Sequence, residues 1–163
     1  SNFCLETMPY LFLKDTHSLL RWIVIIACLW ALARVWSGFF GRAEWSKKDQ
    51  TAGLIFTSLL NLQLVLGLVL YAISPITRSA LGNFAGAMKD SVLRFYAVEH
   101  FAGMLLAVVI AQIGYSISKR AATDRGKFLR AAVLYSIAGL IILASIPWPF
   151  MKYGRPLFPS FDG

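Results

Sequence analysis

Two histidines are the residues of this chain best suited to metal or redox chemistry. His17 and His100 are the only histidines among its 163 residues. Each stands near the head of a long apolar run, and Glu99 directly precedes His100. A neutral imidazole is a common metal ligand and a common axial ligand of haem iron. The two side chains therefore make a candidate metal or b-type haem site, provided that the fold brings them together.

Two further residues could help to hold such a cofactor. Arg21 follows His17 by four residues and therefore shares its face if this segment is helical. An arginine fork matches the geometry of a carboxylate, so Arg21 could bind a haem propionate. Met104 lies one helical turn after His100 and could ligate or pack against a porphyrin. We therefore count Arg21 and Met104 as candidate cofactor-binding residues.

Ionisable residues also crowd the start of the apolar run that contains His100. Arg94 and Glu99 lie there, and an acid, a base and a guanidinium together could bind a quinol headgroup and pass its protons outward. Arg94 could equally bind a propionate. A simpler interpretation is a set of ion pairs at the membrane boundary. In that case His17 bonds water, and His100 pairs with Glu99 or a backbone carbonyl.

The composition places the chain in a membrane. It is 58% hydrophobic and 15% charged, whereas a soluble domain is about 45–50% apolar and about 25% charged. The net charge of +8 would suggest nucleic acid on a soluble protein. Here the basic residues punctuate apolar runs, so membrane topology and anionic headgroups explain them better. We expect the lipid bilayer as a partner, and no nucleic acid.

Four apolar runs reach spanning length, at about 20 residues for ~30 Å of hydrocarbon. They cover residues 19–40, 52–73, 92–118 and 131–148. Because backbone groups must be hydrogen-bonded within the lipid, we expect these runs to be helices. The sequence predicts an all-α membrane protein with one transmembrane domain over 1–163, including ordered N- and C-terminal tails that pack against other subunits.

Short connections join the first span to the second and the third to the fourth, which predicts an up-down-up-down four-helix bundle. The face with these two connections carries nine of the basic residues, against seven on the other face. The nine are Arg34, Arg42, Lys47, Lys48, Lys119, Arg120, Arg125, Lys127 and Arg130. The excess of positive charge predicts that the connections are cytoplasmic and that both termini lie outside.

The histidines belong to the first and third spans, which run in the same direction and occupy diagonal corners of such a bundle. His17 precedes Arg34 by 17 residues, and His100 precedes Lys119 by 19 residues. At 1.5 Å per residue these separations are about 26 and 28 Å. If Arg34 and Lys119 mark the same membrane edge, the two imidazoles lie at nearly equal depth.

Five short motifs carry a resemblance to known proteins: "HSLLRW" (17–22), "LQLVLGLVLY" (62–71), "MKDSVLRF" (88–95), "VEH" (98–100) and "IPWPF" (146–150). In these the chain resembles small four-helix bacterial membrane proteins labelled cytochrome b or cytochrome b-like, over about residues 10–150. The resemblance implies a haem b bound by His17 and His100 in the bacterial inner membrane. With two histidines, the chain can form at most one bis-histidine haem site.

No nucleophile elbow, phosphate-binding loop or HExxH motif is present, so we expect no self-contained catalytic site. The leading hypothesis is a membrane subunit of a respiratory or photosynthetic electron-transfer complex, with one haem near the outer face. The alternative is a structural subunit without a cofactor. A weaker alternative is a quinol-binding module built on Glu99 and His100.

Overall fold

The computed structural model describes residues 2–159, with side chains from residue 8 onward, and this part of the chain is helical with no strand. The elements are α1 (Asn2–Phe40), α2 (Lys47–Ile73), α3 (Pro75–Gly82), α4 (Phe84–Ala87), α5 (Ser91–Arg94), a π-helical turn η1 (Phe95–Glu99), α6 (His100–Lys119) and α7 (Asp124–Ser145). The elements α5, η1 and α6 follow one another without a break and form one long helix.

Four helices are long and apolar enough to cross a membrane, which confirms the predicted class and number of spans. They run over Met8–Phe40, Lys47–Ile73, Ser91–Lys119 and Asp124–Ser145. The first helix begins well before the predicted start of its span at residue 19. Lys14 and Asp15 end the apolar run but not the helix, because charged side chains are compatible with helical backbone. His17 therefore lies inside α1 and not at its start.

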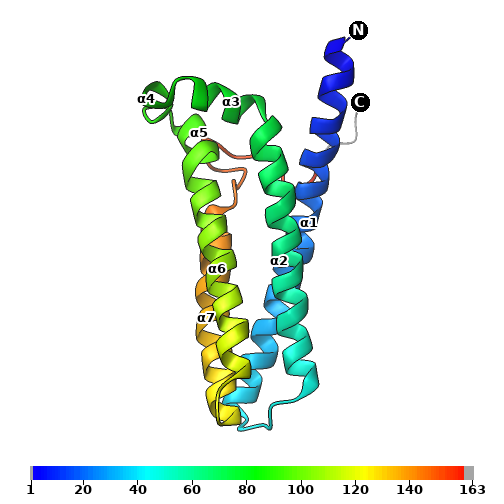
Figure 1. Cartoon of the computed structure of the whole chain (residues 1–163), viewed down its shortest axis with the longest axis vertical. Coiled ribbons are helices and arrows are strands. Elements are labelled where there is room, and N and C mark those ends of the chain that lie inside the picture. The colour runs from blue at the N-terminus through cyan, green and yellow to red at the C-terminus, as the bar shows by residue number, and fades with distance from the viewer. Residues whose placement is uncertain (1, 160–163) are drawn as a thin grey trace.

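The four long helices pack in a ring. Helix α1 packs against α2 and α7, and α6 packs against the same two helices, so α1 and α6 occupy opposite corners. Figure 1 shows the start of α1 and the end of α7 toward one end of this arrangement, which we call the terminal end. The α1–α2 and α6–α7 connections lie at the other end, which we call the loop end. All four helices carry exposed large apolar side chains, as expected of a surface that faces lipid.

The loop-end half of the bundle is tightly packed. Its largest fully buried side chains include Phe56, Phe128 and Tyr135, surrounded by buried alanines from all four helices. Gly53 and Gly114 lie directly against Tyr135, and a methyl group at either position would collide with that ring or its neighbour. Small residues thus bring the helix backbones close together, as is common in membrane bundles.

An ion pair joins α1 to the start of α2 at the loop end. Arg34 donates from Nε and Nη2 to Oδ1 of Asp49 at 3.0 and 2.6 Å. The other carboxylate oxygen accepts from the backbone N–H and the hydroxyl of Ser46, so Asp49 also caps α2. Only 3% of the Asp49 side chain is exposed. The buried carboxylate of Asp49 therefore joins α1 to α2 and also caps the start of α2.

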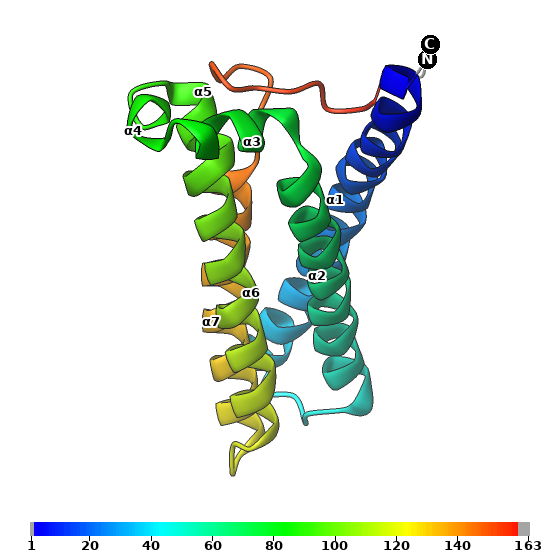
Figure 2. The ribbon, with the colours of Figure 1, turned by 45° about the horizontal axis from the view of Figure 1, so that its top comes forward.

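The terminal end carries two additional structures. Helices α3 and α4 form the connection between α2 and α5, and residues 146–159 form a segment that we call the C-terminal strap. Figure 2 shows the strap leaving α7 and crossing the terminal end toward α1. Tyr153 of the strap stacks on Phe95 of η1 at 3.8 Å between ring centres, and Phe158 stacks on Trp22 of α1 at 5.5 Å. These two aromatic residues of the strap therefore pack against helices of their own chain.

Candidate functional site

Helix α1 presents His17 to the interior of the bundle. His17, Arg21 and Val24 recur at helical spacing and line the same cavity between the four helices. Side chains of a helix lean toward its N-terminus, so the long side chain of Arg21 extends back past the level of its own Cα. Its Nη2 reaches the carbonyl of Leu157 in the strap at 2.6 Å. Helix α1 therefore brings a ring and a guanidinium to the terminal half of the bundle.

The π-helical turn η1 sets the direction of His100. Its residues Phe95–Glu99 insert a wider turn directly before α6, and the N–H of His100 bonds to the carbonyl of Phe95. A π-helical turn contains one residue more than an α-helical turn, so it changes the direction of the side chains that follow it in the helix. Such turns occur frequently at functional sites. The carbonyl of Ala97 in this turn accepts the hydroxyl of Tyr71 from α2 at 2.8 Å. The turn is thereby held in place by a neighbouring helix.

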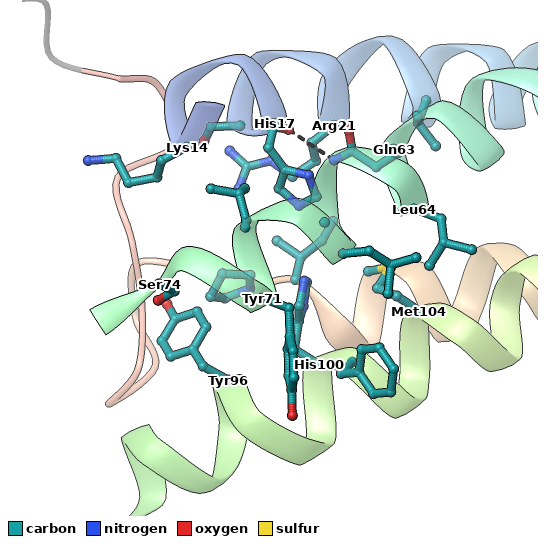
Figure 3. Close-up of a pocket in the computed structure, with 18 of the residues that line it drawn as sticks. Lys14, His17, Arg21, Gln63, Leu64, Tyr71, Ser74, Tyr96, His100 and Met104 are labelled. Atoms are coloured by element: carbon teal, nitrogen blue, oxygen red, sulfur yellow. Dashed lines mark hydrogen bonds between the residues drawn. The ribbon is translucent and has the colours of Figure 1, made fainter. Parts of the chain in front are cut away.

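The two imidazoles come together across the bundle. Their ring centres are 6.4 Å apart, and the ring planes are inclined at 75°. Figure 3 shows the rings pointing toward one another from α1 and α6 into a shared space. Metal–imidazole bonds are about 2.0–2.1 Å long, so two imidazoles on opposite sides of one ion have ring centres roughly 6 Å apart. The spacing suits a pair of axial ligands, and it also lies within the range of a direct edge-to-face ring pair.

A backbone carbonyl orients the ring of His100. Nδ1 lies 2.7 Å from the carbonyl oxygen of Ser145, the last residue of α7. A carbonyl can only accept, so Nδ1 carries the proton and Nε2 keeps its lone pair. Ile146 precedes Pro147 and is extended, so α7 ends at Ser145 and no following helical N–H reaches this carbonyl. Proline in "IPWPF" therefore leaves an acceptor that fixes the tautomer a metal-binding imidazole needs.

Helix α2 supports His17 from the other side. Gln63 donates from Nε2 to the backbone carbonyl of His17 at 2.9 Å, as drawn in Figure 3. One turn further along α2, a methyl group on Gly67 would lie 3.3 Å from Cε1 of His17. Glycine at this position therefore leaves the imidazole ring the space that it occupies.

Three buried side-chain nitrogen or oxygen atoms lack a hydrogen-bond partner within residues 2–159, and all three line this cavity. They are Nδ1 of His17, Nε of Arg21 and Oε1 of Gln63. An unpaired buried polar group costs about 1–3 kcal/mol, so native structures rarely leave several together without a partner. Their concentration in one place indicates a site for a ligand with polar groups or for bound water.

The cavity itself combines these polar groups with a large apolar wall. Its volume is about 170 Å³, smaller than the roughly 300–1,000 Å³ of common ligand pockets, so a larger ligand would extend out through its mouth. Its apolar lining includes Leu64, Tyr71, Phe101 and Met104. Leu68 also lines it, and because 45% of that residue is exposed, the cavity opens at the α2 side of the bundle. An extended apolar ligand with a few polar groups fits this description.

The candidate residues from the sequence divide into two groups. His17, Arg21, His100 and Met104 line the cavity. Arg94 and Glu99 do not line it; they pair with each other, with Nε of Arg94 2.6 Å from Oε1 of Glu99. Arg94 also donates to the carbonyl of Met88 at 3.0 Å. The geometry thus supports four of the six residues as one site. The other two form an ion pair near the start of the long helix that contains His100.

Two imidazoles are the nitrogen ligands that haem iron accepts, and this donor set fits the group. Among the described residues, no three His, Cys, Asp or Glu side chains gather into a metal site. A closed structural zinc site needs four such ligands. His17 and His100 are therefore the residues that would hold a haem at this site.

Several residues of the site did not stand out in the sequence. Gln63, Tyr96, Ser145 and Arg155 were not among the candidate site residues. A polar residue such as Gln63 inside an apolar span was a usable signal. The carbonyl of Ser145 gave only an indirect signal, through the proline two residues later that ends the helix.

Comparisons with protein-family models, with curated proteins and with solved structures found no match for this chain.

Proposed function

We propose that this protein is an electron-transfer subunit that binds one b-type haem between His17 and His100. The observation that carries the proposal is the pair of imidazoles from opposite corners of the bundle, with ring centres 6.4 Å apart over one cavity. The bond from Nδ1 of His100 to the carbonyl of Ser145 supports it, because it leaves Nε2 as the metal-binding nitrogen. The bound haem would supply reversible one-electron chemistry.

The chain's own residues would position the ligand and exclude water. His17 and His100 would bind from two sides, and apolar side chains such as Leu64 and Phe101 would cover the faces between the helices. Met104 lines the same cavity one turn after His100, where it would pack against a porphyrin. An apolar surrounding of this kind tunes the potential of a haem by its low dielectric.

For the membrane arrangement, we propose an up-down-up-down crossing with both termini outside and the two short connections in the cytoplasm. The support is the position of the start of α1 and the end of α7 at the terminal end, together with the excess of basic residues near the loop end. The resemblance to small bacterial cytochrome b-like proteins favours the bacterial inner membrane. The cavity would then lie in the outer half of the bilayer.

A single one-electron carrier needs a donor and an acceptor, so we propose that the chain works within a larger respiratory or photosynthetic complex. The length of α1 supports this. Its 39 residues extend over about 58 Å, nearly twice the ~30 Å thickness of a hydrocarbon core. Met8 and Phe12 are exposed there by 64% and 72%, which makes the outer part of α1 a surface that other subunits would cover.

A structural subunit without a cofactor is the second candidate. The inclination of 75° between the rings of His17 and His100 is that of an edge-to-face pair, which needs no ligand between the rings. A quinol module would also use His100, but the pairing of Glu99 with Arg94 separates that carboxylate from the cavity. The haem-binding subunit and the structural subunit differ in whether the purified protein absorbs visible light.

The test is a reduced-minus-oxidised spectrum of the full chain purified in mild detergent. A band at the haem b position with about one haem per chain supports the proposal, and His17→Ala or His100→Ala should remove the band. Glu99→Gln is the matched control, because Glu99 lies beside His100 in the sequence but outside the cavity lining, and it should leave the band unchanged. Featureless absorbance of a folded protein from a haem-supplied host would leave the structural subunit as the function.

A further inference from the structure

The ionisable lining of the cavity is cationic, apart from its histidines and tyrosines. Lys14, Arg21 and Arg155 line it, and no Asp or Glu is among its described lining residues. Charged groups at the edge of a low-dielectric space are costly unless they are paired. The cavity therefore favours a ligand that carries negative charge at the same end.

Arg21 and Arg155 differ from other arginines of the chain in their partners. Arg34 and Arg94 each contact a carboxylate, at 2.6 Å in both cases. Neither Arg21 nor Arg155 forms an ion pair with any described residue. Nε of Arg21 is buried without a hydrogen-bond partner in the described chain, although its Nη2 bonds to the carbonyl of Leu157. An unpaired donor of a guanidinium at the cavity points to an acceptor supplied by the ligand.

Arg155 reaches the cavity from the strap. Its Nε donates to the hydroxyl of Tyr96 at 2.9 Å, and its guanidinium lies over the Tyr96 ring at 4.9 Å from the ring centre. Tyr96 in turn donates to the carbonyl of Tyr153. Tyr96 precedes His100 by one turn toward the terminal end, so these contacts hold Arg155 on the terminal side of the two histidines. The side chain of Tyr10, which also lines the cavity, lies within hydrogen-bonding reach of the same guanidinium. Arginine has five N–H donors, so these contacts leave others for a ligand.

We propose that Arg21 and Arg155 form a carboxylate-binding site at the terminal end of the cavity. The inference rests on the proposed function, in which the carboxylates are the two propionates of the haem. Arg21 comes from α1 and Arg155 from the strap, and the bond to Leu157 connects the two. Arginine forks bind carboxylates in pairs of parallel hydrogen bonds. Lys14 plays a lesser part, because its ammonium lies 3.7 Å from the carboxylate of Asp15.

The test compares two porphyrins that differ only in their carboxylates. Full-length protein from a haem-deficient host, in detergent, is titrated with haem b and with haem b dimethyl ester, and the Soret band is followed. We expect the dissociation constant to be at least about tenfold lower for haem b. Arg155→Gln and Arg21→Gln should each reduce that preference, and the double variant should bind the two porphyrins within about threefold of each other.

Arg94→Gln is the matched control, since Arg94 lies near the same end of the bundle but does not line the cavity; it should keep the full preference. Arg155→Gln changes a residue outside the long helices, so it tests the idea even if Arg21→Gln fails to fold. Equal affinity of the wild type for both porphyrins would overturn the carboxylate site while the haem proposal stands. If neither porphyrin binds, both proposals fall.

Discussion

The rings of His17 and His100 stand 6.4 Å apart although their helices do not pack against each other. Helices α1 and α6 are diagonal, and each is positioned by its contacts with α2 and α7. The distance between the rings is therefore set by residues on other helices: Gln63 and Gly67 beside His17, and Ser145 beside His100.

Gly67→Ala should weaken haem binding. The added methyl group would lie 3.3 Å from Cε1 of His17, closer than most contacts of this kind, so the ring must shift by a few tenths of an ångström. This shift is smaller than a 30° displacement from a rotamer, which costs roughly 0.5–1.5 kcal/mol, so we expect a loss of affinity of about twofold. Haem titration measures the change. Gly82→Ala is the control, because a methyl group there meets no atom within 4 Å, and an equal effect at both positions would refute the explanation.

Deleting Val98 should convert the π-helical turn into ordinary α-helix without redirecting His100. The N–H of His100 bonds to the carbonyl of Phe95, so five residues here complete the turn that four complete in an α-helix, and with one residue fewer His100 keeps nearly the same direction relative to Phe95. We expect the visible band to be retained, and circular dichroism to show the helical content retained. A deletion variant that loses the band while it stays helical would show that the π-helical turn itself, and not only the register of the helix, is needed to orient His100.

The aromatic contacts of the strap should slow the loss of haem. Tyr153 stacks on Phe95, and Phe158 stacks on Trp22. Such pairs contribute about 0.5–1.5 kcal/mol each beyond the burial of their area. The Tyr153→Ala/Phe158→Ala variant should release haem to a scavenging apoglobin several-fold faster than the wild type. Lys152→Ala, in the same segment, should release it at the wild-type rate; an unchanged rate in the double variant would exclude a covering role.

Asp49→Ala should destabilise the bundle without affecting the cavity. Removing one partner of a fully buried ion pair costs about 3–5 kcal/mol, and because 37% of the Arg34 side chain is exposed, we expect about 2–3 kcal/mol here. Unfolding in a denaturing detergent measures the loss. The visible band of the folded variant should be unchanged, because Asp49 lies at the loop end. Asp124→Ala breaks a more exposed ion pair at the same end and should change stability much less.

The helical class and the four spans could be predicted because an apolar run of spanning length in lipid has almost no alternative to a helix. That the histidines come together followed from counting residues back from Arg34 and Lys119. Arg34 was a valid marker because it pairs with Asp49 at the loop end. That the two imidazoles bind haem stays a prediction.

Other parts of the site had no readable pattern. Residues 146–159 lack a helical or strand period, so nothing indicated that Arg155 returns to η1 or that Leu157 reaches Arg21. The π-helical turn depends on tertiary contacts such as Tyr71 with Ala97, and these are not local in sequence. Lys14 and Asp15 limited the predicted first span, since hydrophobicity reports the lipid boundary and not the end of the helix.

The contrast between an open terminal half and a solid loop half has an electrical consequence. Phe56, Tyr135 and their alanine neighbours fill the loop half closely, whereas the cavity in the terminal half is open at its mouth and has Lys14, Arg21 and Arg155 among its lining residues. A transmembrane voltage drops mainly across the least polarisable layer. At about 2.3 kcal/mol per unit charge for 100 mV across the whole bilayer, an electron that reaches the histidines from the terminal side would cross only a small part of that drop. The transfer of an electron onto this site should therefore depend little on the transmembrane voltage.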